Sequence, residues 1–323
     1  MSTTTAPRPV QTQAAAGAIA VALVSAASFG LSGPFAKALL EAGWSPSAAV
    51  LVRVGGAALV LLPFVLRAWR KRRPSTRDGR ILLTYGVVAV AGAQLCYFSA
   101  VQTLSVGVAL LLEYLAPVMM VAFVWTRTRR APGRRTMIGS VVSMVGLVLV
   151  LNLGGSVEVD PIGVLWGLAA AVCLCAYFMI SARVDESLPP VVLAGGGLAI
   201  GTVAVGVVGL VGIVPLEATT GHVDLLGRSV SWFVPLIVLV GVSTVAAYLT
   251  GIVAAARLGS KVASFVGLTE VMFAVLFAWV LLGELPVAIQ LLGGLAILGC
   301  VALVHGDETR PTIVDDPLPI GTP

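Results

Sequence analysis

Two glutamates and one arginine stand inside long apolar stretches of this sequence: Glu113, Glu270 and Arg53. A charged group at the centre of a membrane costs on the order of 2.5–3.5 kcal/mol on insertion scales, so such residues normally face a protein interior or water and find a partner. Small residues share a helical face with each acid, as Ala109 and Ala116 do with Glu113, and small residues allow neighbouring helices to approach closely. The pattern predicts that both acids face inward.

Three roles are open for these charges. Desolvation disfavours the ionised form of a carboxyl group, so a glutamate in a cavity of low polarity can exchange protons and couple them to transport. Alternatively, ionised Glu113 binds the ammonium group of an amino acid, and Arg53 meets a substrate carboxylate. The third role is a structural ion pair between Arg53 and one of the acids. For Glu270, packing or pairing is as strong an expectation as substrate contact.

Other polar side chains in the apolar stretches are candidates for the same cavity. Gln94, Tyr97 and Gln102 stand in one stretch, and the first two are three residues apart and share a helical face. Tyr177 and Tyr248 come from two further stretches. Tyr114 directly follows the first acid, and one step along a helix is expected to turn it in another direction.

The elements that must position these residues are membrane helices. Of 323 residues, 58% are hydrophobic and only 11% are charged, whereas a soluble domain has about 25% charged residues. Apolar runs of about 18 or more residues are candidate membrane helices. We find ten, which leave no room for a soluble domain: 15–38, 46–67, 81–102, 104–125, 136–153, 161–182, 190–213, 231–253, 262–283 and 286–304. The first is interpreted as a retained helix rather than a signal peptide.

The basic residues follow the membrane topology. Most of the 20 lysines and arginines fall in loops on one side of the predicted membrane if the tails, 1–14 and 305–323, are both cytoplasmic. The net charge of +5 therefore reflects topology and not a nucleic-acid surface. The four cysteines all lie inside predicted spans, where we expect no disulfides. The two histidines are too far apart to form a metal pair, and we expect no metal and no cofactor.

An internal repeat relates residues 100–150 to residues 254–304 at a constant offset of 154. The register has no gap and pairs Trp125 with Trp279 and Gly139 with Gly293. Each half, 15–153 and 161–304, then contains five spans. Because five is odd, the second half enters the membrane inverted relative to the first. The predicted fold is therefore all-α, with ten transmembrane helices as two inverted five-helix repeats, a construction typical of secondary transporters.

Several motifs resemble those of the EamA type of the drug/metabolite transporter superfamily. The matching stretches are "LEYLAPVMMVAFVW" (Leu112–Trp125), "GLTEVMFAVLFAWVLLGELP" (Gly267–Pro286) and "SAASFGLSGPFAK" (Ser25–Lys37). "VQTLSVGVALLLEYLAP" (Val101–Pro117) is similar to the corresponding stretch of bacterial threonine/homoserine exporters. The Glu-Pro pair of the family is split here into Ala116-Pro117 and Glu270-Val271, which predicts a helix kink in the first half and none in the second.

The resemblance implies a secondary transporter that exports small polar metabolites, such as amino acids or related compounds, across a bacterial plasma membrane by alternating access, with possible proton coupling. A non-transporting scaffold or receptor and an exporter of drug-like compounds are the alternatives. The chain lacks an HExxH motif and a Gly-x-x-x-x-Gly-Lys-Ser/Thr phosphate loop, so we expect neither an enzyme nor an ATP-driven pump. The expected partners are a small-molecule substrate, protons and the lipid bilayer, and the expected state is a monomer or homodimer.

Overall fold

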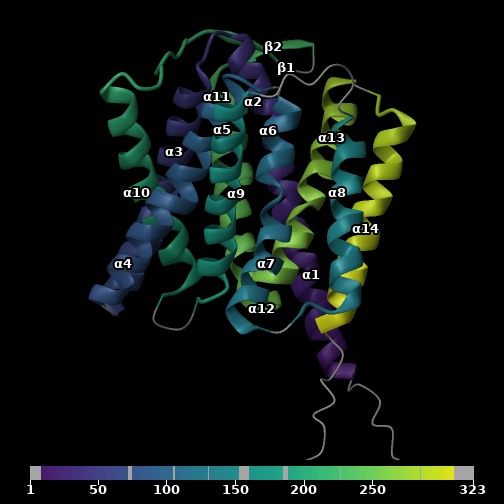
Figure 1. Ribbon diagram of the computed structural model, residues 1–323. Helices are drawn as coiled ribbons and strands as arrows, with labels where there is room; N and C mark the ends of the chain where they lie inside the picture. The colour runs from purple at the N-terminus through teal and green to yellow at the C-terminus, as the bar shows by residue number, and fades with distance from the viewer. Residues whose placement is uncertain are drawn as a thin grey trace, which may run out of the picture.

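Helices make up nearly all of the computed structural model (Figure 1), which describes residues 9–71, 75–104, 106–129, 131–152, 160–184, 188–225, 227–283 and 285–308. The helices are α1 (Pro9–Gly30), α2 (Ser32–Glu41), α3 (Pro46–Lys71), α4 (Thr76–Thr84), α5 (Ala93–Val101), α6 (Val106–Glu113), α7 (Ala116–Thr128), α8 (Arg134–Leu151), α9 (Pro161–Ser181), α10 (Pro190–Leu210), α11 (Phe233–Val240), α12 (Ala247–Gly267), α13 (Thr269–Leu282) and α14 (Ala288–Glu308). Two π-helical segments, η1 (Tyr85–Gly92) and η2 (Gly241–Ala246), continue α4 into α5 and α11 into α12. Strands β1 (His222–Leu225) and β2 (Arg228–Ser231) form an antiparallel hairpin.

The predicted all-α membrane fold is confirmed, while the predicted boundaries shift. Among the described residues, nine helices are long and apolar enough to cross a membrane, and a further apolar segment, Thr269–Leu281, is shorter. Residues 233–267 form one helical run of 35 residues, although we predicted a loop at 254–261 between the spans 231–253 and 262–283. Gly259 interrupts this run with φ 75° and ψ 160°, outside the helical region. α1 begins at Pro9, inside the predicted tail 1–14, and residues 1–8 and 309–323 lie outside the described part of the chain.

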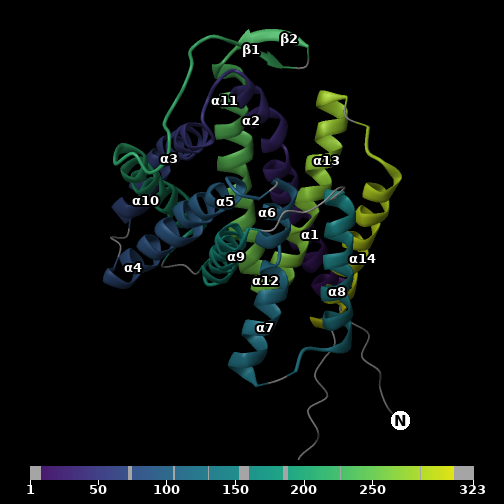
Figure 2. The ribbon, with the colours of Figure 1, turned by 45° about the horizontal axis from the view of Figure 1, so that its top comes forward.

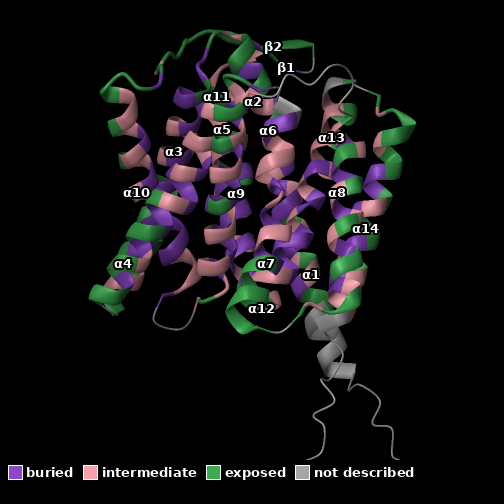
Figure 3. Ribbon diagram, viewed as in Figure 1, coloured by how far each residue is buried: buried purple, intermediate pink, exposed green. Residues whose placement is uncertain are grey.

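The helices form a central group flanked by two outer groups (Figures 1 and 2). α3, α4 and α10 lie on one side of the molecule, and α8 and α14 lie on the opposite side. In the central group, α5 and α6 pack against α9, while α1 packs against α12 and α13. Buried residues concentrate on the inward faces of these helices (Figure 3).

The outward faces carry large apolar side chains. Leu59 on α3, Val203 on α10 and Leu295 on α14 are 69%, 66% and 66% exposed. In water such a surface would drive aggregation, whereas hydrocarbon chains of lipid solvate it. The chain is accordingly a multi-pass membrane protein.

α8 and α14 cross where glycines bring their backbones together. A methyl group at Gly139 would lie 2.8 Å from Val304, and one at Gly293 would lie 2.5 Å from the carbonyl oxygen of Gly146. The offset of 154 that relates Gly139 to Gly293 also relates Gly146 to Cys300, and the Gly139 position also approaches the Cys300 carbonyl, at 3.4 Å. The crossing therefore makes the same contacts twice, and the two helices run antiparallel.

Backbone irregularities recur at the same offset. Arg129 and Gly283, which end α7 and α13, both have left-handed backbone angles, with φ of 56° and 73°. The break between α6 and α7 at Tyr114–Leu115 corresponds to the break between α12 and α13 at Leu268. η2 corresponds to residues 87–92 of η1. Features that depend on local sequence thus coincide in both halves.

The break at Leu268 corrects the prediction that the second segment has no kink. No proline stands there. Instead, the Thr269 hydroxyl donates to the carbonyl of Val266 at 2.7 Å, and the Leu268 amide bonds to Phe265, three residues back, at 3.2 Å. Threonine hydroxyls that bond back to the preceding turn often bend helices. The hydrogen bond of the Thr269 hydroxyl thus interrupts the helix in the second half, as Pro117 does in the first half.

α9 begins with a capping residue, Asp160. Its carboxylate accepts a hydrogen bond from the hydroxyl of Thr103, in the connection after α5, and another from the Gly163 amide at 3.1 Å. These two donors, first Thr103 and then Gly163, hold the pKa of the Asp160 carboxyl below its usual range. Asp160 therefore fastens the start of α9 to the end of α5.

Candidate functional site

A cavity of about 570 Å³ lies between the two parts of the central group. On one side it is lined by η1, α5, α6 and α9, and on the other by α1, α2, α12 and α13, with α3 closing a third side. Seven of the site residues predicted from the sequence line it: Arg53, Gln94, Tyr97, Glu113, Tyr177, Tyr248 and Glu270. The structure thus brings together residues that are spread over more than 200 positions of the chain. The prediction for Gln102 is wrong, because this residue lies in the turn after α5 and is exposed.

Glu113 reaches the cavity at a helix break. Pro117 has no N–H to give to the carbonyl of Glu113, so the helical hydrogen-bond ladder cannot continue past this residue. α6 ends at Glu113 and α7 begins at Ala116, with Pro117 in its first turn, where the missing N–H carries no penalty. The predicted interruption by Pro117 is confirmed, and it places Glu113 at the end of a half-helix.

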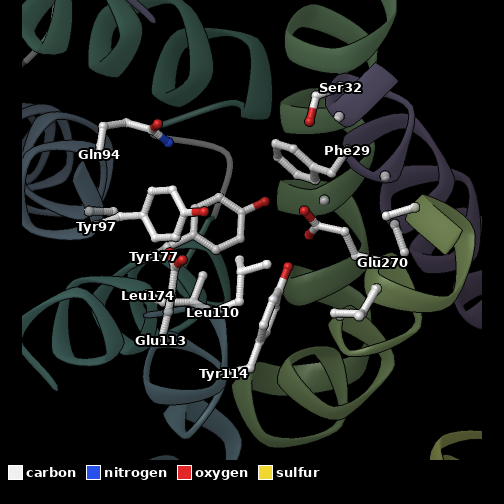
Figure 4. A pocket seen from close by; sticks show the side chains of 18 of the residues that line it. Phe29, Ser32, Gln94, Tyr97, Leu110, Glu113, Tyr114, Leu174, Tyr177 and Glu270 are labelled. Atoms are coloured by element: carbon white, nitrogen blue, oxygen red, sulfur yellow. The ribbon is translucent and has the colours of Figure 1, made fainter. Parts of the chain in front are cut away.

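Tyr114 was expected to point elsewhere, and that expectation is wrong. Tyr114 lines the cavity and its hydroxyl donates to the carboxylate of Glu270 (Figure 4). The prediction assumed a continuous helix through Glu113 and Tyr114, in which successive side chains lie about 100° apart. The break removes this constraint, so both side chains turn inward.

Glu270 faces Glu113 from the other side of the cavity (Figure 4). It lies in the first turn of α13, where α1 comes very close: a methyl group at Gly30 would lie 2.8 Å from the Glu270 carbonyl oxygen. Gly30 ends α1, and Pro34 stands in the first turn of α2, so the Gly30 carbonyl has no partner amide in the following turn. Pro34 thus coincides with a second helix interruption, between α1 and α2.

Arg53 approaches the cavity from α3 without closing an ion pair. Within the described residues, its Nε is buried and has no hydrogen-bond partner. The guanidinium is close enough to Glu270 and Tyr248 to interact with both electrostatically, but the direct ion pair found in the described part of the chain is Lys37 with Glu41, at 4.0 Å. The structural ion pair considered above is thus not formed as a direct contact.

Aromatic rings form much of the cavity wall. Phe29 packs edge-on against Tyr248, with ring centroids 5.3 Å apart, and Tyr248 packs against Tyr177 at 5.8 Å. On the facing helix, Tyr97 lies against Phe98 at 5.5 Å. The Tyr177 hydroxyl is buried without a partner among the described residues.

Sequence reasoning missed four rings of the lining: Phe29, Phe98, Tyr114 and Phe178. Phe98 and Phe178 directly follow Tyr97 and Tyr177, which were predicted. Neighbouring residues on a helix point in different directions, so the prediction that one of them faces the cavity excluded the other. The cavity is wide enough to take both. Phe29 lies within Ser25–Lys37, one of the stretches that resemble the family, so this resemblance could have identified it as a candidate.

The cavity extends toward one end of the bundle. Its lining includes Lys37 and Leu40 on α2 and Pro46 at the start of α3, at the end of the molecule that carries the β1–β2 hairpin (Figure 1). Toward the opposite end, Met120 and Ala255 belong to a buried apolar cluster and are 1% and 0% exposed. The structure therefore has an open and a sealed end.

Comparisons with known proteins agree on one family. The model of the EamA-like transporter family matches residues 16–152 and again residues 161–305. The "Uncharacterized inner membrane transporter YicL" of Salmonella typhimurium is 25% identical over 89% of this chain and 95% of its own length. The "Threonine/homoserine exporter RhtA" of Escherichia coli K12 is 27% identical over 87% of this chain and 88% of its own.

A solved crystal structure shares the fold. It superposes with a TM-score of 0.64 over 92% of this chain and 99% of its own length, at 19% sequence identity. At this identity the likeness concerns the fold alone.

Proposed function

The chain belongs to the EamA-like transporter family, and from this premise we propose that it is a secondary transporter of small polar metabolites, amino acids or related compounds, in a bacterial plasma membrane. The observation that carries the proposal is the cavity itself. It is about 570 Å³ in volume, it lies among the central helices, and the carboxylate of Glu113 faces it without an ion pair to any described side chain. The similarity to proteins named threonine/homoserine exporters favours amino acids as cargo and export as the direction.

Transport proceeds by alternating access between two inverted five-helix repeats, 15–153 and 161–304. Three observations support this division: the family model matches twice, the α8–α14 crossing repeats its contacts at the offset of 154, and the helix breaks recur at that offset. In such folds two halves rock around a site near the membrane midplane, where interrupted helices expose polar backbone groups. Dividing the run 233–267 at Gly259 and joining its last part, 260–267, to α13 gives ten spans.

Glu113 is proposed as the residue that exchanges a proton for the substrate. A carboxylate buried in a cavity needs a positive partner, and no described residue forms an ion pair or hydrogen bond with the side chain of Glu113. A proton or a cationic group of the substrate can supply that partner, one at a time. Competition for one carboxylate couples substrate movement to proton movement in the opposite direction.

Both termini are proposed to be cytoplasmic. Arg127 lies in the last turn of α7, Arg135 in the first turn of α8, Arg183 just after α9 and Arg257 two residues before the interruption of α12 at Gly259. The end of α7 and the start of α8 lie at the end of the bundle opposite the hairpin (Figure 1), and cytoplasmic loops of membrane proteins are enriched in basic residues. In this orientation the open end of the cavity faces outward and the sealed end faces the cytoplasm.

The test is transport by the purified full chain in proteoliposomes. An imposed pH gradient is expected to drive labelled threonine or homoserine across the membrane, and Glu113→Gln is expected to abolish the dependence on the gradient while the protein still inserts. A variant on the lipid-facing surface, Leu295→Ala, serves as the control. A scaffold or receptor would give no flux of any compound, and proton-dependent transport by Glu113→Gln would refute the coupling role.

A further inference from the structure

Seven aromatic side chains surround the space between the two acids: Phe29, Tyr97, Phe98, Tyr114, Tyr177, Phe178 and Tyr248. In Figure 4 the rings of Tyr97 and Tyr177 lie beside Glu113, and that of Phe29 lies near Glu270. The face of an aromatic ring carries partial negative charge and attracts cations, most strongly where water is excluded. The wall of the cavity therefore favours positive charge even before the acids are considered.

The fixed charges of the cavity do not cancel. Arg53 interacts with Glu270, which also accepts a hydrogen bond from Tyr114. Lys37, at the open end, lies 4.0 Å from Glu41. This leaves Glu113. Its titratable neighbours in the described structure include no cation; they are Glu270, Tyr97, Tyr114, Tyr248, Cys96 and Cys173.

We infer that the cavity recognises its substrate through an ammonium group, held between Glu113 and the rings of Tyr97 and Tyr177, and that a substrate carboxylate is not required. The substrate class is then organic amines, which includes amino acids but extends to amines that lack the carboxylate. This inference deepens the proposed function and rests on it in taking the cavity as the substrate site.

The alternative is that Arg53 binds a substrate carboxylate, since its Nε has no partner. Two features disfavour it. The guanidinium already lies near Glu270 and Tyr248, and a ligand carboxylate would bring a third negative group next to Glu113 and Glu270. Like charges at close range in a medium of low dielectric repel strongly, so the carboxylate weakens binding unless Arg53 leaves Glu270.

Three ligands with the same ring separate the two possibilities: 2-phenylethylamine, phenylalanine and 3-phenylpropanoate. Their binding to the purified full chain in detergent is measured by calorimetry. We expect the amine to bind most tightly, phenylalanine to bind about as well or up to about tenfold more weakly, and the acid not to bind. Binding of phenylalanine without binding of the amine would show that the ligand carboxylate is required, as expected if it binds Arg53, and would overturn the inference.

Variants then locate the ammonium group. Glu113→Gln is expected to weaken binding of the amine at least about tenfold, and Tyr97→Leu about three- to tenfold, while Tyr97→Phe retains the ring and most of the affinity. Thermal unfolding of each variant shows whether it is folded. Equal loss in Tyr97→Phe and Tyr97→Leu, or unchanged binding by folded Glu113→Gln, would contradict the inference. Because these are binding measurements, they stand even if proteoliposomes show no flux, which would refute the proposed function alone.

Discussion

The two halves of the molecule agree in their scaffold and differ at the site. At the α8–α14 crossing, each half contributes the same contacts, with Gly139 and Gly293 in corresponding positions. At the cavity, Glu113 and Glu270 stand beside corresponding helix breaks but on opposite sides of them, Glu113 at the end of α6 and Glu270 at the start of α13, and they have unlike surroundings. Glu270 accepts a hydrogen bond from Tyr114 and has Arg53 nearby, whereas no described residue donates a hydrogen bond to the carboxylate of Glu113. The symmetric scaffold thus carries two unlike acids. We call Glu270 anchored, because its carboxylate is hydrogen-bonded to a side chain of the protein, and Glu113 unanchored, because its carboxylate is not.

The difference has a physical consequence. An anchored carboxylate has its charge compensated permanently by the protein, so it contributes to packing and to holding the two sides of the cavity together. An unanchored carboxylate in a cavity has its charge compensated only by what enters the cavity. The first is suited to a structural role and the second to binding and release.

The largest expected effect comes from exchanging each acid for its neutral amide. Glu113→Gln is expected to lower transport by about ten- to a hundredfold, because a hydrogen bond to a charged group contributes about 1.5–3 kcal/mol. Glu270→Gln is expected to retain proton-dependent transport at a reduced rate. Initial rates of uptake into proteoliposomes measure both. Equal losses in the two variants would remove the distinction between the acids.

The anchoring contact itself can be broken from the other side. Tyr114→Phe removes the hydroxyl that donates to Glu270 and is expected to cost about 1–3 kcal/mol of stability, since the carboxylate remains buried without that donor. Tyr97→Phe is the matched control, because no described residue is hydrogen-bonded to the Tyr97 hydroxyl. Thermal unfolding in detergent measures both, and an equal change in the two variants would show that Tyr114 does not anchor Glu270.

The symmetry of the scaffold can be tested with methyl groups. Gly139→Ala and Gly293→Ala each force a contact shorter than 3.0 Å at the α8–α14 crossing and are each expected to destabilise the protein by about 1–3 kcal/mol. Gly299, on the same helix as Gly293, has open space around it, so Gly299→Ala is the control. A strong effect at one crossing glycine and none at the other would break the proposed equivalence of the two helices.

The membrane fold and the charged residues of the site could be predicted from the sequence, because they follow from composition and from the spacing of apolar and charged residues. The apolar runs gave the all-α membrane fold, and the charges inside them gave Glu113, Glu270 and Arg53. Tyr114 could not be predicted, because its direction depends on a helix break whose extent is set by packing. The Leu268 break could not be predicted from proline content, because a threonine hydroxyl makes it. The anchoring of Glu270 depends on a contact between residues 156 positions apart, which no local pattern reveals.

The smallest expected effect lies outside the cavity. The depressed pKa of the Asp160 carboxyl means that its ionised form is favoured by folding, so its contribution is present above the ordinary pKa of an aspartate and is lost as the pH falls through the lower folded-state value. Asp160→Asn is expected to lower the Tm slightly at neutral pH and not at strongly acidic pH. Thr103→Val is expected to do the same. A loss in either variant that persists unchanged in acid would indicate another cause.

The central claim is that Glu113 is the acid whose proton is exchanged for substrate. Its most direct test is the number of protons released when 2-phenylethylamine is added to the purified protein in weakly buffered detergent solution, measured with a pH electrode. The account predicts substrate-dependent release by the wild-type chain and by Glu270→Gln, and none by folded Glu113→Gln. Release by Glu113→Gln equal to that of the wild type, or its loss in Glu270→Gln alone, would contradict the account.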